Sequence, residues 1–407
     1  MSTKTAAPKA KKPAPNPQKK LLLTASKKTI NANTVLPILE DILFTPGFAR
    51  VTDLETDVTI PFKMDGVPKD GVCIPAKMFG EIMDMLESPS VEVCKDFGVT
   101  LKEGKREIKL MGEDPMNFPK NPGEDWKPIG TIQGDQIQDI ATALCFVSTD
   151  DLRPAMTGIY FNENIVATDA HRLFWKPIET MKQDFILPSK SAKIILALGG
   201  EKWEVFHDGK FHVKWVNDQG AEVVSRVIDA RFPDYKVVIP DVKDAIASII
   251  THPDMMLKEL KNAGKFANKS TNQVVLTLNG ELSIHSQDVD FSFEYNNVID
   301  FGEFHFAKNY NPFKLAGVNG DPDMVGTIKN KKGVIMFYPY GGVGREVKME
   351  DLTPIQPELS IGFNEKFLSE IISKTPKDSP ATIKLWGSTK AAIINESFLL
   401  MPLMLNQ

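Results

Sequence analysis

The sequence predicts an α+β protein made of three domains that share one architecture. The first observation is a repeated apolar strand, whose copies are Ile42–Phe44, Ile159–Phe161 and Val274–Leu276. The second is a hydroxyl residue in the short strand after each copy. These residues lie 116 and 118 positions apart, at Thr52, Thr168 and Ser286. Self-similarity at a fixed period is typical of repeated structural units, so we expect three copies of one fold.

A helix followed by a two-stranded hairpin also occurs three times. The helices are expected at 78–86, 191–198 and 365–373, each introduced by a short apolar segment. The strands after them alternate apolar and polar residues, which predicts half-buried antiparallel sheet. The expected domains are therefore 21–128, 129–242 and 243–407.

The third copy carries an insertion. The hydroxyl residue and the helix entry are 23 positions apart in the first copy and 20 in the second, but 76 in the third, from Ser286 to Gly362. About 55 additional residues therefore lie near 300–358. This stretch contains Asn-Gly and Gly-Gly turn pairs, so we expect a small β-rich elaboration.

Residues 1–20 have a different composition from the rest of the chain. They contain six lysines, four prolines and no acidic residue, so they cannot bury a core and are expected to form a disordered basic tail. The two interpretations of the tail are a solubilising segment and an auxiliary arm that tethers DNA. The whole chain has 48 basic and 53 acidic residues, a net charge of −5. Without the six lysines of the tail, 42 basic and 53 acidic residues remain, a net charge of −11. Any contact with DNA therefore needs a segregated basic face.

The sequence shows no motif of an enzyme, a cofactor site or a metal site. Hydrophobic residues make up 42% and charged residues 25%, which is typical of a globular protein. Cys73, Cys94 and Cys145 follow no metal or redox spacing, and a reducing cytoplasm is the expected compartment. The glycines at 341–344 are followed by Arg-Glu instead of the Lys-Ser/Thr of a phosphate loop. We therefore expect no catalytic residue, no cofactor and no metal.

Six short motifs, in this order and spacing, resemble the bacterial DNA polymerase III β subunit, the β sliding clamp. They are Val35–Leu39, Thr52–Glu55, Ala167–Leu173, Arg231–Tyr235, Ile361–Asn364 and Met401–Leu405. The resemblance covers residues 21–407. It implies three clamp domains per chain, each with antiparallel sheets outside and two helices inside. It also implies that the chain forms a ring as a head-to-tail homodimer.

The function implied by the resemblance is that of a processivity factor in DNA replication. Such a ring encircles double-stranded DNA without reading its sequence. It tethers the replicative DNA polymerase and the clamp loader through short hydrophobic peptides. The resemblance implies no enzymatic activity, no cofactor and no membrane partner.

The resemblance carries a peptide-binding pocket over to matching positions. In the family this pocket lies between the second and third domains, and flexible methionines suit a groove that serves several partners. The matching residues are Met156, Thr168, Ala170, His171, Arg172, Leu173, Pro233, Val237, Val238, Thr389, Leu399, Met401, Pro402, Leu403 and Met404. Without the resemblance, the apolar run 401–405 is interpreted as an ordinary last strand that completes a core.

One stretch fits a helix that faces DNA. Its lysines are spaced three, four and four residues apart, on one predicted helical face, and its apolar residues form a second stripe. These lysines are Lys258, Lys261, Lys265 and Lys269. The spacing alone favours a solvated surface helix, whereas the resemblance favours contact with DNA phosphates. Further candidates on the other repeated helices are Lys190, Lys193, Lys366 and Lys374.

The resemblance also implies where the ring closes. An edge strand of the first domain is expected to meet the first helix and the edge of the third domain in a second copy. The matching apolar residues are Ile108, Leu110 and Phe266.

The chain departs from the family pattern at several of these positions. Val237 and Met404 stand where arginine is usual, and Ala170 replaces the glycine before the histidine. The first strand is expected to be shortened or missing and the first helix abbreviated to about 24–30. Such divergence fits a phage-encoded protein or an outlying bacterial lineage. Two alternative functions stay open, a clamp-like binding protein that forms no ring and a hydrolase with its site in the 300–358 insertion.

Overall fold

The computed structural model describes residues 17–31, 34, 36–87, 89–122, 125–178, 181–288, 290–308, 310, 312–315, 324–331, 334–339 and 343–405. The chain divides into two compact units. The first unit comprises 1–167 and 176–232, and the second unit comprises 168–175 and 233–407. Helices and antiparallel strands occur in both units, so the predicted α+β class is confirmed.

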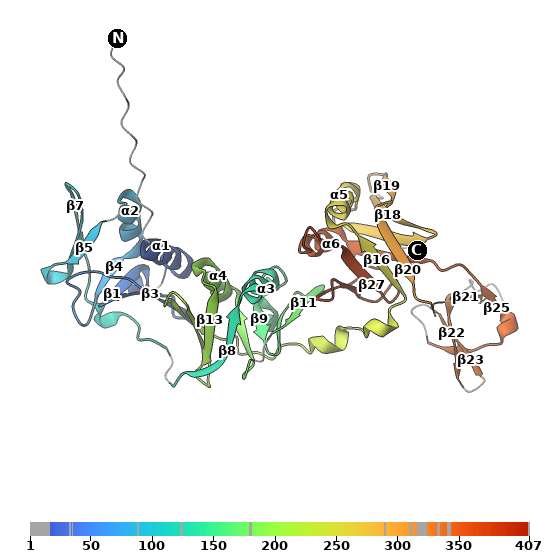
Figure 1. Ribbon diagram of the computed structural model, residues 1–407, viewed down its shortest axis with the longest axis horizontal. Coiled ribbons are helices and arrows are strands. Elements are labelled where there is room, and N and C mark those ends of the chain that lie inside the picture. The colour runs from blue at the N-terminus through green and yellow to red at the C-terminus, as the bar shows by residue number, and fades with distance from the viewer. Residues whose placement is uncertain are drawn as a thin grey trace, which may run out of the picture. The chain divides into compact units, whose positions relative to one another are not determined.

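The main sheet of the first unit joins strands from the first two copies of the repeat (Figure 1). Its order is β4 (Val72–Pro75), β1 (Asp41–Thr45), β2 (Phe48–Thr52), β3 (Thr56–Pro61), β15 (Glu222–Arg226), β14 (His212–Asn217), β13 (Lys202–His207) and β8 (Lys127–Gln133). A smaller sheet has the order β5 (Ser90–Val93), β6 (Gly98–Glu103) and β7 (Arg106–Met111). A further group of paired strands has the order β12 (Phe185–Pro188), β9 (Gly158–Phe161) and β10 (Asn164–Thr168). All the described pairings between these strands are antiparallel, as the alternating sequence pattern predicts.

The helices of the first unit pack in a row (Figure 1). They are α2 (Ala76–Met85), α1 (Pro17–Thr29), α4 (Ser189–Leu198) and α3 (Asp135–Ala143). Beneath them lies an aromatic core, in which the buried rings of Trp203 and Trp215 meet edge to face at 6.5 Å. Phe161 and Phe185 stack at 5.0 Å beside Trp215. Such rings contribute most of the apolar area that a core removes from water.

The first helix is longer than the sequence predicts. It spans Pro17–Thr29, so residues 17–20 belong to α1 and the expectation of a disordered segment through residue 20 is wrong for them. The physical reason is burial, because Leu22, Ala25 and Ser26 all face the interior and anchor the helix. Residues 1–16 lie outside the described residues. Within the described part of the chain, no strand precedes α1.

Asp41, at the start of β1, is a buried carboxylate in an unfavourable environment. Burial raises its pKa to about 6, and the charges of Glu113 and Glu40 add to this effect. The group therefore favours the folded state most when it is protonated. This stabilisation is complete below about pH 3.8, where the unfolded chain is also protonated, and it is lost as the pH rises to about 6.

We expect Asp41→Asn to remove this loss, because an amide has no charge to desolvate. Between pH 4 and 6 the free energy of unfolding of the wild type should fall relative to that of the variant, by about 2 kcal/mol. Urea titrations at several pH values would measure the difference. An unchanged pH dependence in Asp41→Asn would contradict the assignment of this titration to Asp41.

The second unit contains two further sheets and two helical elements of the repeat. One sheet has the order β11 (Arg172–Pro177), β29 (Phe398–Leu400), β28 (Ala392–Ile394), β27 (Ala381–Leu385), β16 (Ala247–Thr251) and β20 (Gly302–Phe306). The other has the order β19 (Phe293–Val298), β18 (Glu281–Asp288), β17 (Gln273–Asn279) and β26 (Leu359–Asn364). The helices are α5 (Pro253–Gly264) and α6 (Glu365–Ile372), which pack against each other.

The stretch expected to hold an insertion folds as a separate small sheet. Its order is β24 (Arg345–Glu346), β23 (Val334–Pro339), β22 (Met324–Lys331), β21 (Pro312–Leu315) and β25 (Leu352–Pro354). Leu315, Phe337 and Leu352 form its own buried core. The two ends of the sheet meet, because the amide of Ile355 donates to the carbonyl of Pro312 at 3.1 Å. The turn residues 319–322 and 340–342 lie outside the described residues, and the domain boundaries stay predictions.

Candidate functional site

The segment 168–172 of the second unit forms a tight turn that its own side chains hold closed. The Thr168 hydroxyl donates to the carbonyl of Arg172 at 2.7 Å and accepts from the amide of Ala170 at 3.1 Å. Oδ1 of Asp169 accepts from the amides of His171 and Arg172 at 2.9 and 2.8 Å. Ala170 has a φ of 74°, a conformation that side chains other than glycine rarely adopt. These bonds keep Ala170 and His171 exposed at the tip.

The C-terminal segment lies beside this turn. β29 pairs antiparallel with β11, with Leu399 opposite Leu173, and the amide of Met401 donates to the carbonyl of His171 at 3.0 Å. Further along, the amide of Leu403 donates to the carbonyl of Gly362 at 2.8 Å. A Cβ atom at Gly362 would lie 2.6 Å from Nε2 of Gln273 and 3.1 Å from the Leu403 carbonyl, so glycine suits this close approach.

Arg172 joins the turn to α6. Its guanidinium contacts Asp169 at 2.9 Å and Oε2 of Glu370 at 2.6 Å, and its Cζ atom lies 4.3 Å from the centre of the Phe367 ring. The Phe367 ring in turn stacks with His171 at 6.1 Å. Only 7% of the Arg172 side chain is exposed. Phe367 and Glu370 are absent from the sequence-based prediction of the site, and the structure adds them to it.

The predicted pocket residues fall into three groups. Val237, Val238, Met401 and Met404 are apolar and exposed, by 76%, 50%, 41% and 76%. Leu173, Leu399, Thr168 and Arg172 are buried and form the support of the site. Pro233, Thr389, Ala170 and His171 are exposed, whereas Pro402 and Leu403 are half-buried. Met156 belongs to the first unit, in the turn Pro154–Thr157.

The first unit contains a second copy of this backbone frame. At residues 52–56, Thr52 Oγ1 accepts from the amide of Leu54 at 3.1 Å, and Asp53 Oδ1 accepts from the amides of Glu55 and Thr56 at 3.1 and 2.6 Å. Leu54 has a φ of 76°, as Ala170 has 74°. The amide of Arg226 donates to Glu55 at 2.9 Å, which matches the bond from Met401 to His171. The first two copies of the predicted repeat therefore match at the level of single hydrogen bonds, whereas the Ser286 hydroxyl of the third donates to the carbonyl of Ala263.

The two copies differ in their side chains. In the first unit the turn is closed by hydroxyl groups, because Thr56 Oγ1 lies 3.0 Å and Ser225 Oγ 2.7 Å from Ser191 Oγ. Its surface is charged, with Arg226 and Glu55 forming an exposed ion pair at 3.6 Å. The copy in the second unit has Arg172, Phe367 and Met401 at the corresponding places. The first copy exposes one apolar side chain at its tip, Leu54, whereas the second copy combines exposed Met401 with the rings of His171 and Phe367.

The comparisons with known proteins agree with this geometry. No family model matches the chain. A β sliding clamp of Haemophilus influenzae is 23% identical over 291 residues, which cover 65% of this chain and 77% of that protein. A β sliding clamp of Rickettsia bellii is 23% identical and is matched over 56% of its length.

Solved structures extend the likeness over nearly the whole chain. The β subunit of the DNA polymerase of Streptococcus pyogenes has a TM-score of 0.73 at 17% identity, covering 96% of this chain and 99% of that one. The chain has the fold of the bacterial β sliding clamps. The DNA polymerase III β subunit of Thermotoga maritima has a TM-score of 0.71 at 18% identity and covers 96% of this chain and 98% of that one. A sliding clamp of Pseudomonas aeruginosa bound to griselimycin has the same TM-score and identity, covering 95% and 97%. These matches confirm the predicted resemblance and the clamp fold.

On this clamp fold, the predicted lysine face of α5 is only partly helical. Lys258 and Lys261 are exposed on α5, opposite the buried Met256, Leu260 and Ala263. The helix ends at Gly264 with Lys265 as its C-cap in a helical conformation, so only the placement of Lys269 on the same helical face is wrong. Glycine disfavours helix by about 1 kcal/mol, and the Asn268 side chain bonds to the amide of Ser270 instead. All four lysines are nevertheless exposed.

The other candidate lysines of the clamp fold differ from one another. The ammonium of Lys190 contacts Asp53, the carbonyl of Thr29 at 2.9 Å and Oδ1 of Asn31 at 2.7 Å. Because an ammonium has three donors, these contacts occupy all of them. Lys193 and Lys366 are exposed and Lys374 is half-buried. The structure adds exposed lysines on α1, which the sequence-based prediction did not include: Lys20, Lys27 and Lys28.

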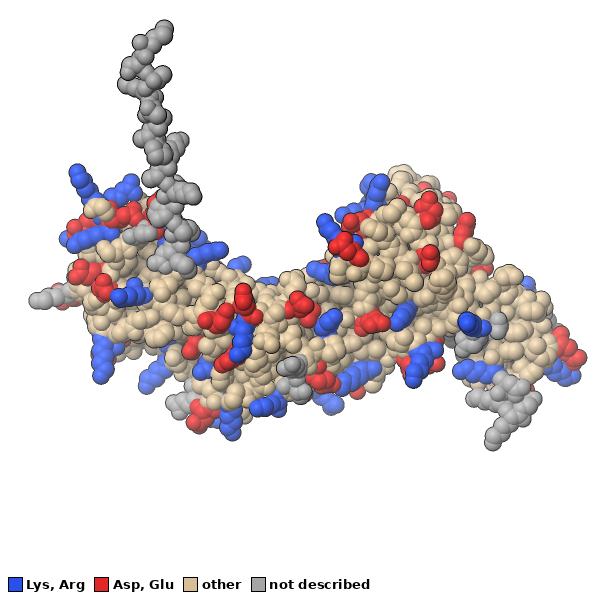
Figure 2. Space-filling view, in the orientation of Figure 1, with Lys and Arg blue, Asp and Glu red and all other residues tan. Residues whose placement is uncertain are grey.

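Charges of both signs share the surface that carries these lysines. Figure 2 shows basic side chains over α5 with acidic ones next to them. Contact with a phosphate backbone at α5 would therefore depend on a few lysines and not on a broad basic patch.

The residues predicted to close a ring lie on or beside two edge strands. β7 lies at the edge of its sheet, with Ile108 and Leu110 half-buried. In the second unit, Phe266 stacks on Tyr295 of the edge strand β19 at 5.4 Å. Buried Glu259 of α5 accepts a hydrogen bond from the Tyr295 hydroxyl at 2.5 Å, which raises the pKa of Tyr295 to about 12. Glu259 thus fixes β19 against α5.

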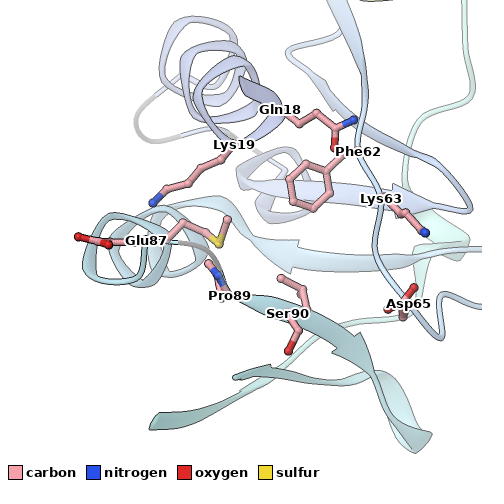
Figure 3. A pocket seen from close by; sticks show the side chains of 10 residues that line it. Gln18, Lys19, Phe62, Lys63, Asp65, Glu87, Pro89 and Ser90 are labelled. Carbon is pink, nitrogen blue, oxygen red and sulfur yellow. The ribbon is translucent and has the colours of Figure 1, made fainter. Parts of the chain in front are cut away.

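A separate pocket of about 320 Å³ lies in the first unit (Figure 3). Its lining has charges of both signs, from Lys19, Lys63, Asp65 and Glu87. Nζ of Lys19 donates to the carbonyl of Leu86 at 2.5 Å, at the end of α2. Such a lining favours neither an anion nor a cation, so we assign it no ligand.

No group of three or more His, Cys, Asp or Glu side chains in the described part of the chain is placed to hold a metal ion. None of the described helices is long and apolar enough to cross a membrane.

Proposed function

We propose that this protein is a DNA sliding clamp, a processivity factor that acts without catalysis. The observation that carries the proposal is a clamp fold whose C-terminal segment exposes Met401 and Met404 and is bonded to the turn 168–172. Exposed apolar side chains gathered in one part of a protein mark sites of interaction with other proteins. The frame that holds this surface is rigid, because the turn 168–172 and the C-terminal segment are hydrogen-bonded to each other.

In this proposal two copies of the chain close head to tail into a ring around duplex DNA in the cytoplasm. Each copy contributes three clamp domains, 21–128, 129–242 and 243–407. The edge strand β7 with Ile108 and Leu110 meets Phe266 and β19 of the second copy. Unpaired edge strands favour such addition, because each presents free amide and carbonyl groups to another chain.

The ring holds DNA by topology and contacts it by charge. Lys258, Lys261 and Lys193 are exposed on repeated helices, and contact with phosphates carries no sequence information. The polymerase and the clamp loader bind through short hydrophobic peptides at the predicted pocket residues. Phe367 joins that set because it stacks with His171.

The decisive experiment combines solution mass with retention on DNA. Light scattering should give twice the mass of one chain. The protein, once loaded, should stay on nicked circular DNA and slide off the same DNA after it is made linear. A monomer that leaves both substrates equally fast would support the clamp-like protein that forms no ring, and measurable hydrolysis of DNA or nucleotide would support the enzyme alternative.

Replacing Lys258, Lys261, Lys265 and Lys269 together by Glu should weaken contact with DNA at every sequence tested. The number of counterions released should fall, so the slope of log affinity against log salt should become shallower, by about 1 for each phosphate that the variant no longer neutralises. Fluorescence anisotropy with DNA duplexes of different sequence measures both effects, with a light-scattering check that the variant is still a dimer. A strong sequence preference in the wild type would contradict phosphate contact as its basis.

A further inference from the structure

We infer that Glu370 of α6 is a positioning residue for partner capture, acting through Arg172 on Phe367. The inference rests on the proposed function, because it concerns the same apolar surface. The residues involved all belong to the second unit.

The contacts form a chain from α6 to the exposed tip of the turn. Glu370 Oε2 lies 2.6 Å from Nη1 of Arg172, and the opposite side of the guanidinium is held by Asp169 at 2.9 Å. The guanidinium covers the Phe367 ring at 4.3 Å. Phe367 stacks with exposed His171 at 6.1 Å. The two carboxylates thus fix the plane of Arg172, and that plane fixes the rings next to the apolar surface.

These contacts also exclude a different role for Arg172. Its side chain is 7% exposed, and both ends of its guanidinium already bind carboxylates. It therefore offers no free donor pair to an acidic group of a partner. Arg172 serves as a wall of the site, and the partner is recognised by apolar side chains packed against the rings and methionines.

The first unit supplies an internal comparison. Its matching turn has Thr56 in place of Arg172, and α4 has Ser191 in place of Phe367 and Ile194 in place of Glu370. There the Thr56 and Ser191 hydroxyls lie 3.0 Å apart and close the turn directly. The same backbone frame therefore occurs with and without the carboxylate, the guanidinium and the ring. Only the frame that has all three carries the exposed Met401.

The test compares Glu370→Gln with the control Glu365→Gln in the full-length protein. Glu365 lies on the same helix, but its carboxylate accepts from Ser369 at 2.6 Å and faces Gly264. The probe is a fluorescein-labelled extended peptide that carries adjacent Leu and Phe side chains. We expect Glu370→Gln to weaken its binding about tenfold or more, since hydrogen bonds between charged groups are strong, and Glu365→Gln to leave binding unchanged.

Two further readouts separate positioning from a general structural effect. In an Arg172→Ala background, Glu370→Gln should weaken binding no further, because the residue acts through the guanidinium. The imidazole proton resonances of His171 should shift in Glu370→Gln but not in Glu365→Gln, because the Phe367 ring current acts on them. Glu370→Asp, which keeps the charge, should restore part of the affinity.

The outcomes are distinguishable. If Glu370→Gln binds the peptide as tightly as the wild type, or if its effect adds fully to that of Arg172→Ala, the inference about Glu370 is overturned while the proposed function stands. If the wild type fails to bind any such peptide, the proposed function itself is overturned, and the role of Glu370 with it.

Discussion

Deletion of residues 401–407 is expected to abolish capture of hydrophobic peptides. The deletion removes Met401 and Met404, two of the four exposed apolar side chains, together with the backbone that lies beside the turn 168–172. Burying two Leu or Phe side chains of a peptide stabilises a complex by about 3–6 kcal/mol before the cost of ordering it. The wild type should therefore bind with affinity on the micromolar scale, and the truncated protein should show no binding in fluorescence anisotropy.

A second variant keeps this prediction testable if the truncation perturbs the fold. The backbone bonds of Met401 and Leu403 join the segment to His171 and Gly362, and the truncation removes them. The double substitution Met401→Ser and Met404→Ser keeps these backbone bonds and removes only the two exposed apolar side chains. It should lose most of the affinity and retain the melting temperature. Equal binding by the wild type, the truncation and the double variant would show that the pocket lies elsewhere and would remove these residues from the site.

Phe266→Asp is expected to convert the dimer into monomers. Phe266 is half-buried against Tyr295 at the edge of the second unit, where the proposed ring closes. In a closed interface the new carboxylate would be buried without a partner, at a cost of several kcal/mol. Light scattering over a range of protein concentrations should give the mass of one chain for the variant and of two chains for the wild type.

The matched control is Phe211→Asp, at the turn between β13 and β14. Phe211 is 48% exposed and lies away from the edge strands β7 and β19 in the chain. This variant should remain dimeric, and circular dichroism should show both variants folded. A Phe266→Asp protein that elutes with the wild type as a dimer would rule out this residue as part of the closing contact. A wild type that is itself monomeric would remove ring closure altogether.

The repeat was readable from the sequence because its signals are local. A threonine and an aspartate bonded to amides two or three residues away form the turns at 52–56 and 168–172, so a short motif specifies each. The same holds for Gly362, whose neighbours in the motif Ile361–Asn364 introduce α6. These patterns carried the resemblance that predicted the fold, and the pocket residues around Met401 stay a prediction.

What the sequence could not predict depends on contacts between distant segments. Arg172 and Glu370 are 198 residues apart, and nothing in the residues around Glu370 indicates its partner. The same is true of Lys190, which appeared to be a free cation but is bound by Asp53 and Thr29 through the packing of α1 beside α4. The early end of α5 is a different case, because Gly264 and Asn268 indicate it in the sequence. The regular spacing of the lysines nevertheless favours a longer helix than the one observed.

The small sheet at 312–354 enters and leaves the second unit through adjacent residues. Ile355 and Pro312 are joined by a backbone hydrogen bond, and the sheet has its own core around Phe337. To the remaining chain, this whole sheet is equivalent to a single surface turn between β20 and β26. The entropy of closing a loop grows only with the logarithm of its length, so lengthening this turn by about 55 residues costs only about 1–2 kcal/mol. The same junction is a natural place to graft a fluorescent reporter or an unrelated domain.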